Sequence, residues 1–587
     1  MSATTSDGTL SYVVKVDGSE IPAVLTLRSI RVSRSTGAAS HVQLRVDMSN
    51  DANVSVFKVA RAVTISLGWS DDVTEVFAGD IIGLAVSARY GQKELVVDAY
   101  DKSYRFGQSS APQVFVKCSA SDALQQLAGD VGLSSDIDDK LANPKFEYLP
   151  VVGTVQQFIS ELAARAGCEW LIDGGKLIVR PRKADGATAF TFDNDNIVAF
   201  DLRYTASTQT DGVTVRGWDP LNQEAIRGDA KKETLANTAK VMNGNKNTVS
   251  AKTAVIWPRT VVDSNDAAGL ATAAKARMDA ASLTGRVQVL LVPALLPGDL
   301  VEITGVDPEW NGMYYVTAVE HTVDGEGGVT RFTVGGLEPG TLVDLLGRAD
   351  QPSADTMYSG LTIGVVTNIN DEEQELGRVK VKLPYLDDQH ETDFARVLQP
   401  GAGGGRGFQF LPEVNDEVLV AFEHGDRRRP IVLGGLWNRT AKPPPQGVVD
   451  GKVERRAMTS RLGHELLLLD GASDDKQLVA IVTAGKNAEL VLAEDKITLT
   501  SKDKPITLTN GKSTITIDGG DVTIEADTIT LTAKSGDVKV KGINVEVKSD
   551  ANVKVEAGAN LDLKGTAGAK LEAAANTVVK GAMVQIN

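Results

Sequence analysis

Residues 438–587 contain no phenylalanine, tyrosine, tryptophan or cysteine; Trp437 is the last aromatic residue of the chain. Aromatic side chains supply much of the area buried in ordinary domain cores. A segment without them has little with which to close a globular core of its own. The absence therefore argues against a conventional domain at this end of the chain.

Cysteine and histidine are also scarce. Cys118 and Cys168 are the only cysteines, and each follows or ends an apolar stretch, which predicts buried thiols and not a disulfide or a metal site. The histidines show neither His-x-His nor His-x-x-x-His spacing, which are common in metal sites. We therefore expect no metal and no cofactor. The five histidines are His41, His321, His390, His424 and His464.

Positive charge and long apolar runs are lacking as well. The net charge of −16 argues against nucleic acid as the main partner, since phosphate binding needs a basic surface. The one arginine run, 427–429, is predicted to be a solvated turn, with a charge contact between subunits as the alternative. No stretch approaches the roughly 18 apolar residues that span a bilayer, and residues 1–8 show no signal-peptide pattern. The sequence predicts synthesis and assembly in the cytoplasm.

Short pairs of alternating apolar residues recur from Lys496 onward, at a mean spacing of about eight residues. Alternation predicts a strand with one buried face, and the Gly, Asp, Asn, Ser and Lys between pairs predict turns. Two apolar side chains cannot close a core, so such strands must stack on neighbours and on other copies of the chain. The pattern predicts an intertwined trimeric β-helix over 494–587. Its trimer-core candidates are Ile497, Leu499, Ile506, Leu508, Ile515, Ile517, Val522, Ile524, Ile529, Leu531, Val538, Val540, Val545, Val547, Val553, Val555, Leu561 and Leu563.

Two other classes of β-rich rod fit less well. Single-chain β-helices that degrade polysaccharides use longer turns with asparagine and aromatic ladders, whereas this repeat is short and has no aromatics. Trimeric adhesins would need a signal peptide and a membrane anchor, and neither pattern is present. Three chains that share one core remain the preferred interpretation.

Residues 10–104 alternate apolar and polar positions between Gly and Asp clusters, which predicts antiparallel strands. Two helices are expected next, because Ser119 stands three residues before Asp122, and Thr154 three before Gln157, ahead of helical apolar patterns. Gly167 is the predicted stop of the second helix, and a hairpin follows.

A further β-rich stretch contains one alanine-rich helix at about 265–281. The fold class is mainly β. The expected segments are an N-terminal β-barrel domain (1–110), an α+β domain (111–185), a second β-barrel domain (186–345), a linker (346–360), an OB-fold Greek-key barrel (361–442), a linker that leads into the repeat (443–493), and the trimeric β-helix with its tip (494–587).

The OB-fold segment carries the most specific motifs. GRVKVKLP at 377–384, LPEVNDEVLVAFEHGD at 411–426 and PIVLGGLWN at 430–438 read as short strands between glycine turns, which suits a small Greek-key barrel. The glycine-rich loop 401–407 lacks the Gly-Lys-Ser/Thr ending of a phosphate-binding loop. This run resembles the OB domain of VgrG proteins and of the phage baseplate protein V family, where the same motifs follow in the same order.

The resemblance extends over most of the chain. Residues 119–179 resemble the phage late-control protein D family, and 296–301 and 311–316 resemble its later barrel. It implies a homotrimeric hub and spike of a contractile injection system, whose needle caps the inner tube and punctures the target envelope during sheath contraction. The hub of a contractile-tailed phage baseplate is the alternative.

The resemblance also implies partners. They are a hexameric inner-tube protein, baseplate proteins, a PAAR-type tip protein and possible effectors; a target membrane would be met only on firing, within an injection particle or a virion. No catalytic role is expected, since G-x-S-x-G is absent and too few residues separate Trp437 from Thr459 for an inserted enzyme domain. The tip-contact candidates are Met583, Val584, Ile586 and Asn587.

Overall fold

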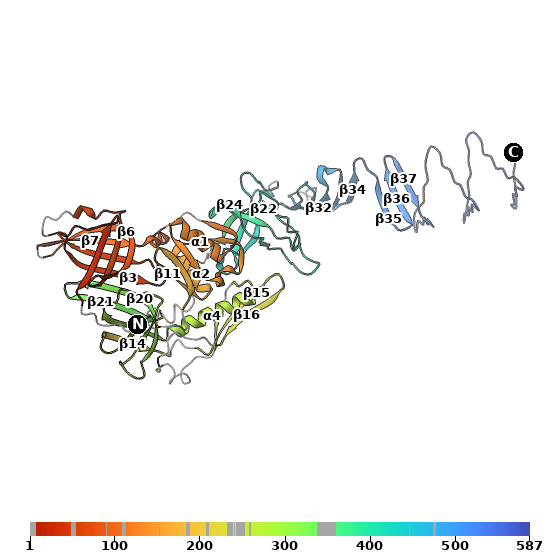
Figure 1. Cartoon of the computed structure of the whole chain (residues 1–587). Coiled ribbons are helices and arrows are strands. Elements are labelled where there is room, and N and C mark those ends of the chain that lie inside the picture. Colours follow the sequence, from red (N-terminus) through yellow and green to blue (C-terminus); the bar gives the residue numbers. More distant parts are fainter. Residues whose placement is uncertain are drawn as a thin grey trace. The chain divides into compact units, whose positions relative to one another are not determined.

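A computed structural model describes the protein (Figure 1). The described residues are 8–48, 54–89, 91–108, 113–151, 153–182, 188–206, 210–231, 239, 241, 253–256, 260–336, 360–444, 447–472 and 477–586. The predicted linker 346–360, apart from Gly360, and the tip candidate Asn587 lie outside them. The chain divides into two compact units, Met1–Pro443 and Pro444–Asn587.

The hub, which we define as residues 8–336, is built on one 13-stranded sheet. Its path runs β14-β18-β21-β20-β3-β4-β7-β6-β5-β1-β2; off this path, β19 pairs with β20, and β13 pairs with β19. The N-terminal strands are β1 (Leu10–Val16), β2 (Ser19–Glu20), β3 (Leu27–Ser35), β4 (His41–Asp47), β5 (Ala62–Trp69), β6 (Asp72–Arg89) and β7 (Gln92–Tyr100), with short helices η1 (Val54–Val56) and η2 (Lys102–Gly107). The later strands are β13 (Phe190–Phe192), β14 (Ile197–Tyr204), β18 (Leu283–Leu290), β19 (Leu300–Ile303), β20 (Gly312–Asp324) and β21 (Gly327–Gly335).

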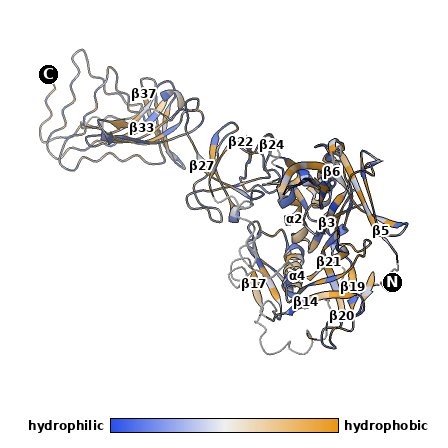
Figure 2. Cartoon of the chain, turned by 90° about the vertical axis from the view of Figure 1, so that its left-hand side faces the viewer, coloured by the Kyte–Doolittle hydropathy of each residue, from blue (hydrophilic) through white to orange (hydrophobic). Residues whose placement is uncertain are grey.

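A single antiparallel pairing joins the two halves of this sheet. β3 pairs with β20 from Ser35↔Ala318 to Ser29↔Asp324. Each half then buries its own core, because alternate residues point to opposite faces of a strand; in β4, Val42, Leu44 and Val46 are fully buried. Figure 2 shows the alternation of hydrophobic and hydrophilic residues along the strands. The mainly β prediction is confirmed.

An α+β insertion, residues 113–182, leaves the sheet after β7 and returns before β13. Ser119 and Asp122 form the capping box of α1, and Thr154 and Gln157 form that of α2, as predicted. Gly167 follows the second helix with φ +69°, a conformation that glycine adopts without strain. The elements are β8 (Val114–Ser119), α1 (Ala120–Asp130), β9 (Ser134–Ile137), η3 (Asp139–Ala142), β10 (Lys145–Pro150), α2 (Val155–Arg165), β11 (Cys168–Asp173) and β12 (Lys176–Pro181).

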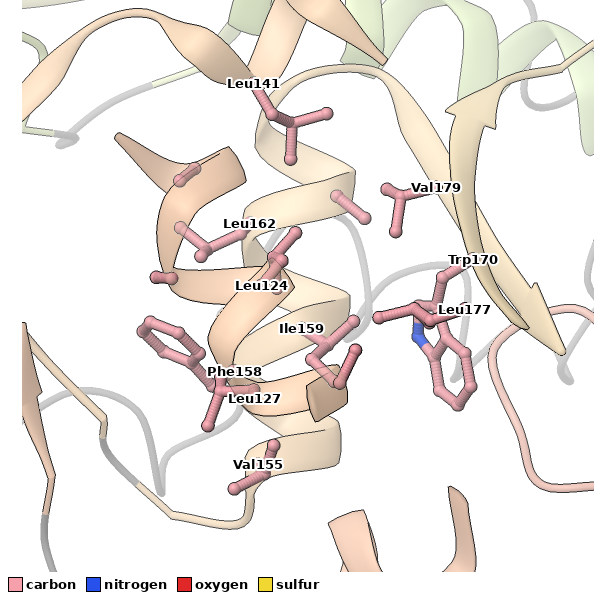
Figure 3. Packing of buried hydrophobic residues seen from close by; sticks show 14 of the residues in the cluster. Leu124, Leu127, Leu141, Val155, Phe158, Ile159, Leu162, Trp170, Leu177 and Val179 are labelled. Carbon is pink, nitrogen blue, oxygen red and sulfur yellow. The ribbon is translucent and has the colours of Figure 1, made fainter. Parts of the chain in front are cut away.

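The core of this insertion lies between its two helices and the β11–β12 hairpin (Figure 3). Trp170 is its largest side chain, and its indole N–H donates to Ser160 Oγ at 2.9 Å. Cys168 is buried, and this burial raises the pKa of its thiol to about 12. Cys118, predicted to be buried, is only partly so, since it lies beside the core and not in it.

A second α+β insertion, residues 210–281, interrupts the later half of the sheet. It contains β15 (Val213–Asp219), β16 (Glu224–Ala230), β17 (Ala254–Ile256) and α4 (Ser264–Ala280). The helix predicted at about 265–281 is thus confirmed, and it packs so closely on β16 that a Cβ at Gly228 would lie 2.1 Å from the backbone of Ala267. This insertion has a hydrophobic cluster of its own. These strands are therefore not part of the second barrel, where their sequence pattern alone placed them.

The OB barrel, residues 361–438, has six strands in the order β24-β23-β22-β26-β27-β25. A bridge between Val379, just before β23, and Ala395, just before β25, closes the barrel around a core made mostly of valines. The strands are β22 (Thr362–Asn368), β23 (Lys380–Leu383), β24 (Asp387–Glu391), β25 (Arg396–Val397), β26 (Glu417–Phe422) and β27 (Pro430–Gly435), with η4 (Glu423–Gly425) between the last two.

The second unit contains two antiparallel meanders, β30–β34 and β35–β37, after the small pair β28–β29. Its elements are β28 (Val448–Val449), β29 (Lys452–Val453), β30 (Arg455–Thr459), β31 (Glu465–Asp470), β32 (Gln477–Val482), η6 (Ala484–Lys486), β33 (Ala488–Ala493), β34 (Ile497–Ser501), β35 (Ile506–Asn510), β36 (Ser513–Asp518) and β37 (Asp521–Glu525). Within the described residues 526–586, no strand forms (Figure 1).

Of the nine predicted apolar pairs, the first four therefore lie in strands and the last five do not. A strand needs a neighbour for its backbone N–H and C=O groups, and one chain offers none beyond Glu525. In the described part of the chain, no helix is long and apolar enough to cross a membrane.

His321 lies fully buried on β20, at the seam with β3. His321 Nδ1 and Thr330 Oγ1 share a hydrogen bond of 2.9 Å, and Thr330 Oγ1 also accepts from the Val292 N–H. Burial, with a smaller contribution from the charge of Arg34, lowers the pKa of His321 to about 3. The seam thus holds an imidazole that cannot charge without leaving its place.

We predict that His321 makes the hub sensitive to acid. The unfolded ring takes up a proton below pH 6.5 and the folded ring does not, so stability falls as pH drops, by about 2 kcal/mol between pH 6.5 and 5. In His321→Leu this part of the pH dependence should disappear. Urea unfolding followed by tryptophan fluorescence measures it, with the exposed His390→Leu as control. Equal pH dependence in both variants would contradict the assignment.

Candidate assembly surfaces

An apolar face that its own chain leaves open is the main feature of the β35–β37 meander. The antiparallel register places Ile506 beside Ile517, and Leu508 beside Ile515; Val522 and Ile524 extend the same rows. Five of these six side chains are between 38% and 63% exposed. One chain thus leaves this apolar face uncovered.

The opposite face of the same meander is lined with threonine. Cross-strand pairs join Thr507 to Thr516 and Thr509 to Thr514, and Thr523 lies beside Thr516. Threonine combines high strand propensity with a polar hydroxyl, so this face suits water. The two faces therefore differ in kind: one fits a protein partner and the other fits solvent.

The same apolar face exists on the β30–β34 meander. One row runs across all five strands through Met458, Leu466, Ile481, Leu490 and Leu499. A second row runs through Leu468, Val479, Leu492 and Ile497 on the last four strands. Two predicted core candidates, Ile497 and Leu499, thus complete a surface of nine apolar residues.

The sequence pattern does not reveal the residues of this face that precede Ile497. Alternation is hidden in ELLLLD at 465–470 because both faces of β31 are apolar: Leu467 and Leu469 are half-buried on the other side, opposite Ala480 and Leu478. The signal that could have found them is the pairing of two consecutive strands, Glu465–Asp470 and Gln477–Val482, with similar apolar content.

Beyond Glu525 the predicted core residues are exposed in the single chain. Ile529, Leu531, Val538, Val540, Val545, Val547, Val553, Val555, Leu561 and Leu563 are each more than half exposed. Short-range ion pairs occupy intervening positions, such as Asp537–Lys539 at 3.1 Å, and such exposed pairs add little stability. The assignment of all eighteen residues to a trimer core stays a prediction, as does the tip contact of the exposed Met583, Val584 and Ile586.

A second surface joins the OB barrel to the hub, and it overturns one expectation. The arginine run 427–429 is not a solvated turn. Arg428 holds Asp426 through its Nε and Nη2 atoms, at 2.9 and 2.6 Å, and is only 17% exposed. Arg429 donates to the carbonyl of Val261, in the hub, at 2.6 Å. The sequence pattern does not reveal this role, because the partner of Arg429 lies far away in the chain.

The hub side of this surface is charged as well. Arg165, the last residue of α2, binds Asp266 of α4 at 2.5 Å and the carbonyl of Thr260 at 3.0 Å. The Thr260 hydroxyl in turn donates to Asp426. The guanidinium of Arg428 lies 5.2 Å from the centre of the Phe146 ring. We call Arg165, Asp266, Thr260, Asp426 and Arg428 the joint cluster.

Electrostatics keep Asp426 and Arg428 of the joint cluster ionised. Burial alone would raise the pKa of Asp426, but the charge and hydrogen bonds of Arg428 outweigh it and hold that pKa well below its usual range. Burial would likewise lower the pKa of Arg428, and Asp426 raises it instead. The pair therefore stays charged at any physiological pH.

Other sequence features have simple structural roles. The glycine-rich loop forms a tight turn in which Gly403 and Arg406 exchange backbone hydrogen bonds, and Gly401, Gly405 and Gly407 have positive φ angles. In the described ranges, no group of three His, Cys, Asp or Glu side chains is arranged to hold a metal ion.

The OB barrel and the hub each match a known family. Residues 362–437 match the type VI secretion system/phage-baseplate injector OB domain. Residues 6–325, more than half of the chain, match the Alg8 N-terminal domain. The two matches together cover most of the first unit.

Curated relatives are similar over shorter stretches. The actin cross-linking toxin VgrG1 of Vibrio cholerae is 30% identical over 184 residues, which are 29% of this chain and 16% of that protein. The type VI secretion system spike protein VgrG2a of Pseudomonas aeruginosa is 38% identical over 74 residues, 12% of this chain and 9% of that protein. The chain thus spans less than a fifth of the length of either relative.

A solved structure shares the fold. It is the lidded Francisella PdpA–VgrG complex, with a TM-score of 0.51 at 10% identity, and the match covers 84% of this chain and 80% of that one. The resemblance to VgrG-type spike proteins and phage baseplate proteins is confirmed. By the match over residues 6–325, the chain belongs to the family of the Alg8 N-terminal domain.

Proposed function

We propose that this protein is the structural hub and spike of a contractile injection system, and that it works as a homotrimer. The apolar faces of β30–β34 and β35–β37 carry the proposal, because they are ordered, continuous and uncovered within one chain. Relatives named as spike proteins support the same reading.

Three copies suit these faces better than two. Each face is only two apolar rows wide, so three sheets set around one axis can enclose all rows in a dry prism. Two sheets packed face to face would leave their long edges open to water and to further pairing. Burying the remaining exposed part of each side chain is worth about 1 kcal/mol, and the many rows of three chains add up to a stable shaft.

The hub would face the rest of the particle. In this proposal its two half-sheets, repeated in three chains, present a pseudo-sixfold collar to a hexameric inner-tube protein, and baseplate proteins surround it. The exposed Met583, Val584 and Ile586 would receive a PAAR-type tip protein, and effectors would travel with the tip or inside the tube.

Sheath contraction would drive the shaft through a target envelope, so function would depend on stiffness and symmetry and not on chemistry. We therefore propose no catalytic role; relatives named as spike proteins support this. The toxin among the relatives is similar over only 16% of its length. A polysaccharide-degrading β-helix is not favoured, since the comparisons point to spike and baseplate proteins.

The kind of particle is a further part of the proposal. A type VI secretion apparatus, an extracellular phage-tail-like particle and a phage virion would each use a protein of this design, with synthesis in the cytoplasm. The genes beside this one distinguish them. Sheath, tube and baseplate genes without capsid genes would support an injection particle, and capsid genes would support a phage.

We predict that the purified chain is a trimer. Sedimentation should give three times the chain mass of 62.2 kDa, and the trimer should resist SDS at room temperature, because unfolding one strand breaks bonds to two partners. A well-folded monomer at micromolar concentration would refute the proposal.

We predict that aspartate on the apolar face abolishes the trimer. The double variant Ile515→Asp/Ile517→Asp would place six carboxylates in one dry layer, and burying unpaired charges costs several kcal/mol each. The matched control is Thr514→Asp/Thr516→Asp, on the same strand but the opposite face, which should stay trimeric. Sedimentation reads out both. Hub tryptophan fluorescence should remain native in each, and equal behaviour of the two variants would contradict the buried face.

We also predict that a chain ending at Glu525 still forms trimers, since it keeps both apolar faces of the meanders. It should dissociate at a lower temperature than the full chain, because it lacks the layers that residues 526–586 would add. A purely monomeric truncated chain would show that the C-terminal segment, and not the meanders, holds the three copies together.

A further inference from the structure

We propose that the joint cluster is a mechanical clamp, which fixes the OB barrel to the hub. The clamp acts within one chain and is independent of trimer formation. Its contacts come from three separate stretches of sequence, so no single motif reveals it.

The OB side of the clamp is a preshaped turn. Asp426 accepts from the backbone N–H of Arg428 at 3.0 Å as well as from its guanidinium. The Arg429 carbonyl accepts from the backbone N–H of Glu423 at 3.0 Å. His424 and Gly425, with φ angles of +51° and +76°, reverse the chain just before the turn. The two charges are therefore held in place before they meet the hub.

The hub side gathers both α+β insertions at one point. Arg165 comes from the first insertion and Asp266 from the second, and their ion pair ties α2 to α4. Thr260 and Val261 lie just before α4, and they bind Asp426 and Arg429 of the OB barrel. The two insertions thus form one binding surface on the hub, and the turn after β26 of the OB barrel contacts it.

Charge balance favours a clamp over an incidental contact. The joint cluster contains two arginines and two aspartates, each less than a fifth exposed. Such a group is stable only when every charge keeps its partner, because an unpaired buried ion is strongly unfavourable. Removing one arginine should therefore loosen both sides at once. Truncating one side chain in an apolar contact of the same size would weaken it only partly, whereas removing one charge here should disrupt the whole contact.

The decisive experiment uses the full-length protein with a protease recognition sequence placed in the predicted linker 346–360. After cleavage, gel filtration shows whether the hub fragment and the OB–spike fragment remain associated. We expect them to co-elute in the parent protein and in the control Arg439→Met, which removes an exposed arginine that follows the barrel. In Arg428→Met we expect them to separate.

Separation of the fragments in the parent protein, or co-elution in Arg428→Met, would overturn the clamp. Hydrogen exchange on the uncut proteins gives a second readout that needs no cleavage. Amides of 260–266 and of the C-terminal turn of α2 should exchange at least tenfold faster in Arg428→Met than in Arg439→Met. Equal exchange would also overturn the clamp, and native near-UV circular dichroism in both variants shows that the barrel still folds.

Discussion

Backbone hydrogen bonding is the constraint on which the second unit depends. Every strand must satisfy its N–H and C=O groups and cover its apolar side chains. The β30–β34 and β35–β37 meanders meet the first demand within one chain and leave the second unmet. Beyond Glu525 neither demand is met by the chain itself. In the proposed trimer, order along this unit would therefore pass from intrachain pairing to pairing with other copies.

The hub follows a different plan, in which one sheet is shared by two cores. Among the described strands, the β3–β20 pairing is the only link in the sheet path between its two halves, and each half is followed or interrupted by an α+β insertion. Because both insertions contribute to the joint cluster, the OB barrel contacts the hub where the two halves of the design converge.

Sequence patterns predicted the local features that are set by near neighbours. The capping boxes at Ser119 and Thr154, the alanine-rich helix α4 and the strands of the first four apolar pairs were all read correctly. The OB barrel and its relatives followed from motifs such as LPEVNDEVLVAFEHGD, because each strand there is short and clearly bounded by turns.

Features that depend on distant parts of the chain could not be read in this way. The role of Arg428 needs Thr260 and Arg165, which no spacing rule connects to it. The upstream part of the apolar face was missed because β31 is apolar on both sides, so its period is invisible. The second insertion was hidden for a similar reason, since its strands look like those of the barrel around it.

The sparse apolar content of residues 526–586 has a consequence for the chain before assembly. In the proposed trimer, a newly made subunit would have to keep this segment in water until two other subunits bind, and a more hydrophobic segment would meanwhile pair with any free strand edge. Two valines or leucines per repeat, among lysine, aspartate and glycine residues, are too few to stabilise such non-specific pairing. The low apolar content that prevents each repeat from folding alone would also keep the unassembled subunit in solution.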